Sequence, residues 1–328
     1  MTTNNGQKFL AWGILLLCLA AIPAGLMGRN NSSSDDKATD KEGKKFSFLS
    51  RKDRIILVKI DGTIQNDEGE GGLFPNPNSC SHARKTLRKA VHDEHIKAVL
   101  LRINSPGGTV AMSQEISDAV KELRESGKPV VVSMGDVAAS GGYYIASAAD
   151  KIYASPGTLT GSIGVIMHLM NLSEVEKKIG VAPFVIKSGQ FKDIGSMDRA
   201  PTKEEVDLLQ SIIMDSYDQF VTAVADGRKM DKEQVKKLAD GRIYSGRQAL
   251  KVKLIDAIGG YEEAMIDIKK ICKDKYHQDL TVDEGRSLSS LASLLEAKIS
   301  VPQSNVLKGL IPESMNPKFT NMPLWMME

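Results

Sequence analysis

Short apolar runs alternate along the middle of the chain with segments whose apolar residues recur every three or four positions. The runs at 54–60, 96–103 and 129–134 are rich in β-branched residues and leucine, which is typical of strands buried in a parallel sheet. The segments between them have the spacing of amphipathic helices. This alternation predicts an α/β fold in which helices cover a parallel sheet. We expect further strands at 151–154, 163–167 and 182–187, and helices at 83–95, 110–125, 140–149, 173–180, 245–252 and 261–272.

Two pairs of residues with capping-box spacing predict where helices begin. Ser173 is followed by Glu176, and Thr202 by Glu205, so that a hydroxyl and a carboxyl can satisfy each other's free amides. The second box opens a long amphipathic helix, and a shorter helix is expected from Asp231 onward. The apolar residues of the long helix, spaced three or four apart, are Val206, Leu209, Ile213, Tyr217, Phe220 and Val224.

The N-terminus has the composition of a membrane segment. The nineteen residues 9–27 carry no charge, and that is about the length needed to cross a bilayer core. A cleaved secretory signal is the alternative, but an Ala-x-Ala site is missing. We therefore expect an uncleaved signal anchor at 9–28. Its orientation is not decided by charge, because Lys8 and the amino terminus face Arg29 on the other side.

The remaining boundaries follow from composition. Residues 1–8 precede the anchor as a short cytoplasmic segment, and 29–52 form a polar tether with too little apolar content to fold. The compact domain is expected at 53–285. The tail, residues 286–328, contains prolines that interrupt helices, yet its end at 322–327 is apolar and is expected to dock on a protein surface.

Composition and charge exclude several functional classes. The net charge of +2 is too small to indicate a nucleic-acid-binding protein. The five histidines are scattered and the three cysteines lack metal-ligand spacing, so we expect neither a metal nor a cofactor. Cys80 and Cys272 either pair or stay free.

The stretch Gly135–Tyr144 carries the first candidate for chemistry. It follows the strand expected at 129–134 and leads into the small-residue segment expected to be helical. Ser140 therefore falls where a strand turns into a helix, which can present a side chain above the sheet edge beside helix amides. This position suits a nucleophile. A filler serine in a tight turn is the structural alternative.

A second glycine-rich turn strengthens the catalytic interpretation. The strand expected at 96–103 runs into Asn104-Ser105-Pro106-Gly107-Gly108, where two adjacent glycines let the backbone approach a ligand closely. An acyl-transfer enzyme needs backbone amides of this kind for the oxyanion of its tetrahedral intermediate. Two such turns in succession, one of them with Ser140, therefore suggest an acyl-transfer site.

A serine nucleophile needs a base, and three residues are candidates. His168 lies 28 residues after Ser140, a spacing near that of Clp-type proteases with a Ser-His-Asp triad, but its apolar surroundings are more typical of a packed histidine. Lys187 and Lys192 lie in a loop after the strand expected at 182–187. A lysine acts as a base only when neutral, so its pKa must fall from about 10.4 toward about 7 or 8. Composition does not choose between the two lysines.

Four motifs, in this order along the chain, are similar to those of the signal peptide peptidase A family. They are Asn104-Ser105-Pro106-Gly107-Gly108, Ala139-Ser140-Gly141-Gly142-Tyr143-Tyr144, Thr160-Gly161-Ser162-Ile163-Gly164-Val165 and Gly189-Gln190-Phe191-Lys192-Asp193. The resemblance covers residues 55–261 and corresponds to the short, single-repeat form of the family.

The resemblance implies a Clp/crotonase-like superfold of repeated strand-strand-helix units behind an N-terminal transmembrane helix. It also implies a Ser-Lys dyad, in which Ser140 is the nucleophile, Lys192 the general base and Ser162 the hydroxyl that orients the lysine. Gly107, Gly108 and Gly141 would supply the oxyanion amides. Members of the family form rings in the bacterial inner membrane, with their catalytic domains outside the cytoplasm.

The sequence therefore predicts a membrane-anchored serine endopeptidase that degrades residual signal peptides and other apolar peptides through an acyl-enzyme. Two alternatives from other classes remain. A crotonase-like acyl-CoA enzyme would also use backbone amides to stabilise an oxyanion, but it would need neither Ser140 nor a membrane anchor. A non-catalytic, ring-forming membrane scaffold would keep the fold and would not need Lys192.

Overall fold

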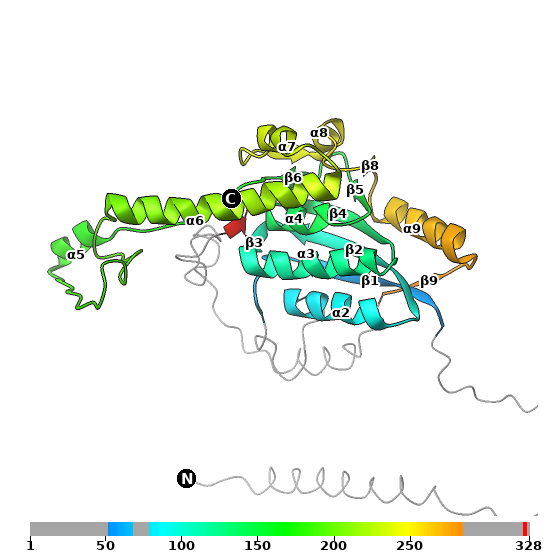
Figure 1. The fold of residues 1–328 in the computed structure, drawn as a ribbon, viewed down its shortest axis with the longest axis horizontal. Coiled ribbons are helices and arrows are strands. Elements are labelled where there is room, and N and C mark those ends of the chain that lie inside the picture. The colour runs from blue at the N-terminus through cyan, green and yellow to red at the C-terminus, as the bar shows by residue number, and fades with distance from the viewer. Residues whose placement is uncertain (1–51, 68–78, 285–323, 327–328) are drawn as a thin grey trace, which may run out of the picture. The chain divides into compact units, whose positions relative to one another are not determined.

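In the computed structural model of the chain, the described residues are 52–67, 79–284 and 324–326 (Figure 1). They contain an eight-stranded sheet with the order β7-β6-β4-β2-β1-β9, and β5 pairs with both β4 and β8. All pairings in this sheet are parallel except that of β6 with β7. The strands are β1 (Arg54–Asp61), β2 (Ile96–Ser105), β4 (Val130–Ala139), β5 (Lys151–Ala154), β6 (Leu159–Gly161), β7 (Ile243–Ser245), β8 (Ala257–Ile258) and β9 (Thr281–Asp283).

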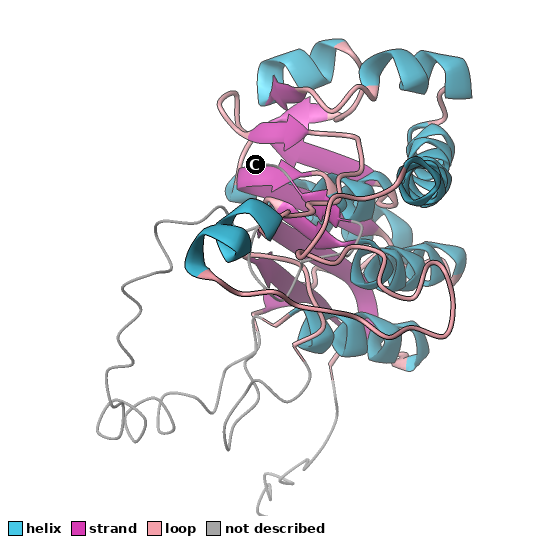
Figure 2. Cartoon of the chain, turned by 90° about the vertical axis from the view of Figure 1, so that its left-hand side faces the viewer, coloured by secondary structure: helices cyan, strands magenta, loops and turns pink. Residues whose placement is uncertain are grey.

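Helices cover both faces of this sheet, and Figure 2 shows the strands stacked with helices packed beside them. The helices are α2 (Cys80–His92), α3 (Val110–Glu125), α4 (Gly141–Ser147), α5 (Ser173–Ile179), α6 (Lys203–Arg228), α7 (Lys232–Leu238), α8 (Gly246–Lys251) and α9 (Tyr261–Tyr276). The parallel α/β fold predicted from alternation is therefore confirmed.

The core has two parts, one on each face of the sheet. Val99 and Leu101 of β2 point into the larger part, under α2 and α3, whereas Leu100 points into the smaller part, under α9. This two-sided burial explains why the strand sequences are apolar at nearly every position. Cys80 belongs to the larger part and Cys272 to the smaller one, and both are free thiols. Of the two alternatives that the sequence leaves open, the structure therefore shows unpaired cysteines and no disulfide.

Most predicted elements occur where expected, but two predicted strands are wrong. The strand that follows β5 is Leu159–Gly161, which pairs with the end of β4, and not 163–167. Residues 182–187 are exposed and belong to no strand among the described residues. Their apolar, β-branched composition resembles a strand, but they lie away from the sheet, and Pro183 lacks an amide for a ladder.

The capping predictions were half right. Thr202 and Glu205 form the predicted box at the start of α6, with the Thr202 hydroxyl accepting from the Glu205 amide and the Glu205 carboxylate accepting from the Thr202 amide. The predicted box at Ser173 is wrong, because Ser173 is already helical and Leu172 is the cap residue. The Ser173 amide instead donates to Asn171 Oδ1 at 3.1 Å, which removes the need for a hydroxyl cap.

Residues 168–212 form an arm that extends away from the body, made of α5, long loops and the first half of α6 (Figure 1). The second half of α6 packs on the body, and Phe220 and Val224 are fully buried there. Val206, from the same apolar stripe, is 47% exposed. The stripe of α6 is therefore covered over only half of its length within one chain.

No helix among the described residues is long and apolar enough to cross a membrane. The expected anchor at 9–28, nearly all of the tether at 29–52 and most of the tail at 286–328 lie outside the described residues.

Candidate active site

Ser140 lies at the turn between β4 and α4, as the sequence predicts. Its backbone has φ 50° and ψ −117°, a region that non-glycine residues occupy at a cost of about 1–3 kcal/mol and that is enriched at active sites. The Ser140 amide donates to Gly161 O at 2.8 Å and its carbonyl accepts from Tyr144 N at 2.8 Å, so both ends of the strained residue are fixed. The Oγ is buried and has no hydrogen-bond partner among the described residues.

A bulge in β4 sets the direction of this turn. Opposite β2, Ile103 pairs with Met134 while Ser105 pairs with Ala138, so β4 contains two extra residues over this stretch. Asn104 holds the bulge, since its Oδ1 accepts from the Asp136 amide at 3.1 Å and from the Val137 amide at 3.2 Å. A Cβ on Gly135 would lie 2.6 Å from the same oxygen, which explains the glycine there.

The predicted glycine turn after β2 forms a short strand, β3 (Gly107–Thr109), beside Ser140. On one edge, Gly107 O accepts from Ile64 N and Thr109 N donates to Ile64 O, each at 2.8 Å. A Cβ on Gly108 would lie 1.9 Å from Ile64 O, so only glycine permits this approach. Because successive residues of a strand face opposite edges, the Gly108 amide and carbonyl face the other edge of β3.

The other edge of β3 is occupied by an extended segment from the end of the chain. This strand, β10 (Leu324–Met326), pairs antiparallel with β3, with Trp325 opposite Gly108 and Met326 opposite Gly107. It also contacts α4, the helix that begins directly after Ser140. The edge beside the predicted nucleophile therefore accepts a peptide in extended conformation.

The three predicted oxyanion donors differ in their surroundings. The Gly108 amide faces the edge where β10 lies, and Gly141 is the first residue of α4, whose amide no intrahelical carbonyl can accept. The Gly107 amide donates to Ser105 Oγ at 3.1 Å. Of the three, Gly108 lies at the edge where an extended peptide pairs and Gly141 directly follows Ser140, whereas the Gly107 amide is engaged by Ser105.

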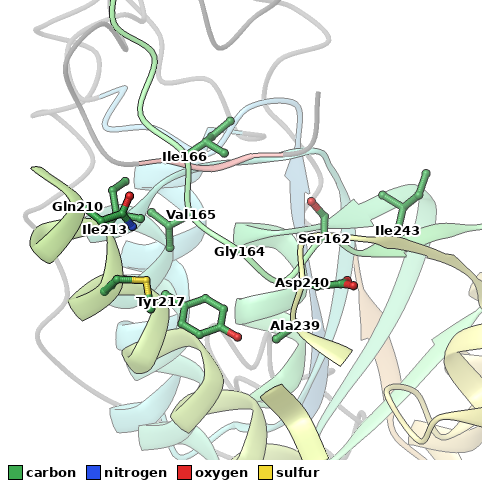
Figure 3. Close-up of a pocket in the computed structure, with 12 residues that line it drawn as sticks. Ser162, Gly164, Val165, Ile166, Gln210, Ile213, Tyr217, Ala239, Asp240 and Ile243 are labelled. Atoms are coloured by element: carbon green, nitrogen blue, oxygen red, sulfur yellow. The ribbon is translucent and has the colours of Figure 1, made fainter. Parts of the chain in front are cut away.

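Ser162 is predicted to orient the lysine. It lies directly after β6 and follows Gly161, whose carbonyl accepts from the Ser140 amide. It also has a positive φ of 50°, and its amide donates to Arg242 O at 2.9 Å. Figure 3 shows its hydroxyl at a pocket of 550 Å³. Much of the pocket wall is apolar and comes from the segment just before the arm and from α6, at Val165, Ile166, Ile213, Met214 and Tyr217.

The lysine predicted to be the base is not brought to Ser140 within this chain. Lys192 is exposed on the arm, and its side chain takes part in none of the ion pairs or hydrogen bonds found among the described residues. The other lysine candidate, Lys187, is engaged instead, with Nζ 2.7 Å from Asp193 Oδ1 and 3.1 Å from Gln190 O. His168 is half-buried at the base of the arm.

Four charged side chains surround the loop that carries Lys192. Arg199 donates to Glu205 with two nitrogens, at 2.8 and 2.5 Å, and its Nε donates to Asp193 Oδ2 at 3.0 Å. Together with Lys187, Arg199 lowers the pKa of the Asp193 carboxyl well below its usual range. The Arg199 guanidinium and the Thr202 amide lower the pKa of Glu205 to about 2.

Sequence reasoning missed four residues that shape this site. Ile64 acts through backbone pairing with β3, and Ser105 through its hydroxyl, which accepts from the Gly107 amide. Neither contact has a local signature, and the sequence indicates Asn104 only as part of a glycine turn. Arg199 follows Lys192 by seven positions, but the segment between them is not helical, so this spacing does not place the two residues on one face. The Thr202–Glu205 capping box was the available signal, since a capping carboxylate needs a cation when it is buried.

Comparison with known proteins agrees with this geometry. Residues 122–274 match the model of peptidase family S49, and residues 77–159 match that of Clp protease. A protein of Enterococcus faecium with the provisional name signal peptide peptidase SppA is 37% identical over 295 residues, which covers 85% of this chain and 84% of that protein. A Synechocystis protein provisionally named as a protease is 50% identical over 222 residues, 67% of this chain and 74% of the relative.

A third relative, protease 4 of Salmonella typhi, is 34% identical over 79% of this chain but only 41% of its own length. The Clp-like α/β domain, together with the matches to peptidase family S49 and to proteases, defines a serine peptidase. The chain belongs to peptidase family S49 and is similar to the signal peptide peptidase SppA proteins.

Proposed function

We propose that the chain is a membrane-anchored Ser-Lys endopeptidase, in which Ser140 is the nucleophile and Lys192 the general base. Lys192 takes the Ser140 proton, the serinate attacks a peptide carbonyl, and the Gly108 and Gly141 amides stabilise the oxyanion. The leaving amine departs with a proton, and water then releases the acyl group from Ser140. Ser162 orients the lysine.

The pairing of β10 with β3 carries this proposal. A protease must hold its substrate extended across the nucleophile, and a strand added to a free edge is a common way to do so. β3 offers such an edge, and three consecutive residues, Leu324 to Met326, occupy it beside α4. An acyl-CoA enzyme has no use for a peptide-binding edge, so this observation favours the peptidase over the crotonase-like alternative.

The position of Lys192 supports a further part of the proposal, that a second copy of the chain completes the site. Ser140 Oγ has no partner among the described residues, while the loop with Lys192 lies on an arm that extends from the body. The arm is also apolar on its surface, with Phe184 84% and Ile186 89% exposed. A neighbouring body that covered this surface would receive Lys192 next to its own Ser140. Repetition of such a head-to-tail contact closes into a ring.

The substrates that we propose are residual signal peptides and other apolar peptides. The pocket at Ser162 offers an apolar wall from Val165, Ile213 and Met214. The relatives named as signal peptide peptidases, and the apolar segment at 9–28, support a site that works on peptides left in the membrane. The catalytic domain would then lie on the outer side of the bacterial inner membrane.

Labelling with a fluorophosphonate probe tests the catalytic proposal. The probe should label the full chain at Ser140, and the label should be lost in Ser140→Ala and strongly reduced in Lys192→Ala. A ring-forming scaffold without catalytic activity would show no labelling. Labelling that persists in Ser140→Ala would place the nucleophile elsewhere and refute the proposal.

A further inference from the structure

The loop that carries Lys192 is held by an ion cluster that joins it to the first turn of α6. Asp193, the next residue after Lys192, lies within 3.0 Å of both Lys187 Nζ and Arg199 Nε. Arg199 also binds Glu205, whose side chain is only 2% exposed. The loop is further closed by turns, since Lys192 N donates to Gly189 O and Ser196 N to Asp193 O.

The charges of this cluster cancel. Lys187 and Arg199 supply two positive charges, and Asp193 and Glu205 supply two negative ones. An unpaired carboxylate beside a lysine stabilises its ammonium form, which cannot accept a proton. Asp193 is bound by the two cations Lys187 and Arg199. Their positive charges offset its electrostatic effect on Lys192. Lys192 itself is outside the cluster, as far as the described residues show.

Most other charged groups of the arm are exposed: Glu174 pairs with Lys177 and Lys203 with Asp207, while Lys178 and Glu204 face solvent. Glu176 and Asp198 are the exception, because they are two half-buried acidic groups that lie near each other outside the ion cluster. Both are unchanged in the variants below, so they do not affect the comparison of the pH midpoints. At physiological ionic strength, exposed charges of this kind are screened within about 8 Å.

We propose that Arg199 is a positioning residue for catalysis: it fixes the loop with Lys192 onto α6 and neutralises Asp193, so that Lys192 is free to act as the neutral base. This inference rests on the proposed role of Lys192. It assigns to Arg199, Asp193 and Glu205 a function in the reaction although none of them would touch the substrate.

The pH dependence of peptidase activity tests the proposal on the full chain. Arg199→Gln leaves the cluster with one excess negative charge, which favours the ammonium form of the base. The midpoint of the rising pH profile should therefore move up by about one unit, with about tenfold lower kcat at neutral pH and recovery in alkaline buffer. Asp193→Asn creates the opposite imbalance and should move the midpoint down.

Two further variants separate charge from folding. The double variant Arg199→Gln/Asp193→Asn restores neutrality and should bring the midpoint back near that of the unmodified chain. Lys203→Gln removes one positive charge from the same first turn of α6, where Lys203 pairs only with Asp207 at the surface, and should leave the profile in place. Thermal unfolding of each variant shows whether it is folded.

A uniform loss of activity at every pH in Arg199→Gln, or an unchanged midpoint in both single variants, would overturn the proposal and reduce the cluster to a structural clamp. If Arg199→Gln does not fold, Asp193→Asn alone decides. The failure of the underlying proposed function would look different, because Lys192→Ala would then remain active.

Discussion

At the scale of single residues, the site depends on one strained backbone position and one exposed lysine. Ser140 has a positive φ that the fold maintains through two backbone hydrogen bonds. Lys192 is solvent-exposed in the single chain, so nothing within the described residues removes water from it. In the proposed mechanism, a partner copy therefore supplies the surroundings in which Lys192 becomes a neutral base.

The first prediction concerns the identity of the base. Lys192→Ala should abolish peptidase activity, and so should Lys192→Arg, because a guanidinium stays charged at any working pH. His168→Ala should keep most of its activity. Steady-state rates on a fluorogenic peptide measure this, and a dead His168→Ala with an active Lys192→Ala would assign the role to a Clp-like triad instead.

Activity should also rise with pH, since the lysine acts only after losing its proton, with a midpoint well below the value of about 10.4 for a free lysine. A flat profile between about pH 6 and 10 would count heavily against a lysine base.

At the scale of elements, the catalytic geometry arises where β2, β3, β4 and α4 meet. The bulge in β4 turns the strand toward α4, and Asn104 is the side chain that holds it. β3 is held on one edge by Ile64 and receives β10 on the other. None of these contacts is local in sequence, so each depends on the completed sheet.

Asn104→Ala should remove the acceptor of the Asp136 and Val137 amides, at a cost of about 0.5–1.5 kcal/mol in stability because these hydrogen bonds are exposed. Because the bulge aims Ser140, kcat should fall by more than this loss of folded protein explains. Asn171→Ala is the matched control, since it removes a single exposed amide acceptor on the arm. Equal kinetics for the two variants would show that the bulge does not aim Ser140.

The tail yields a prediction at the same scale. β10 occupies the edge that a substrate would need, so deletion of Asn321 to Glu328 should raise peptidase activity, mainly through a lower KM, or weaken the oligomer. Trp325→Pro, which removes the amide opposite Gly108, should act in the same direction more weakly. If rates and sizing chromatography are both unchanged by the deletion, the tail does not compete for this edge.

Much of this architecture could be predicted from the sequence, because its elements carry strong local signals. The boundaries of α3 at Val110 and Glu125 and the start of α6 after Thr202 were predicted from periodicity and capping, and the turn at Ser140 from the change between strand and helix patterns. What failed was long-range. The run at 182–187 has strand composition but no edge to pair with, and Asn104 and Ile64 act through contacts that only the sheet creates. The roles of the site residues remain predictions.

At the scale of the whole molecule, a single chain holds the proposed nucleophile and the proposed oxyanion amides near a peptide-binding edge, but it does not bring the proposed base to them. The arm holds Lys192 away from the body, and half of the apolar stripe of α6 is uncovered. Both features are explained if the arm of one copy packs against the body of the next copy.

We expect specificity to be set at this scale too, because the pocket combines residues of the body, of the segment just before the arm and of α6. Peptides with Leu or Ala before the scissile bond should be cut far faster than peptides with Asp or Lys there, since a charged side chain would lose its hydration against the apolar wall. Asp240, the acidic residue that lines the pocket, is already paired with Arg242. Competition between such peptides measures the ratio of kcat/KM, and the reverse ranking would contradict an apolar pocket.

The most direct test is complementation between two inactive variants. Ser140→Ala retains Lys192, and Lys192→Ala retains Ser140. When the two variants are co-expressed in equal amounts, an intact site forms only where the Lys192 of a Ser140→Ala chain meets the Ser140 of a Lys192→Ala chain. If the dyad forms between copies in a head-to-tail ring, random assembly should restore about one quarter of the unmodified activity, although each variant alone is inactive. Absence of activity at every mixing ratio, with mixed oligomers demonstrated, would contradict a dyad shared between chains.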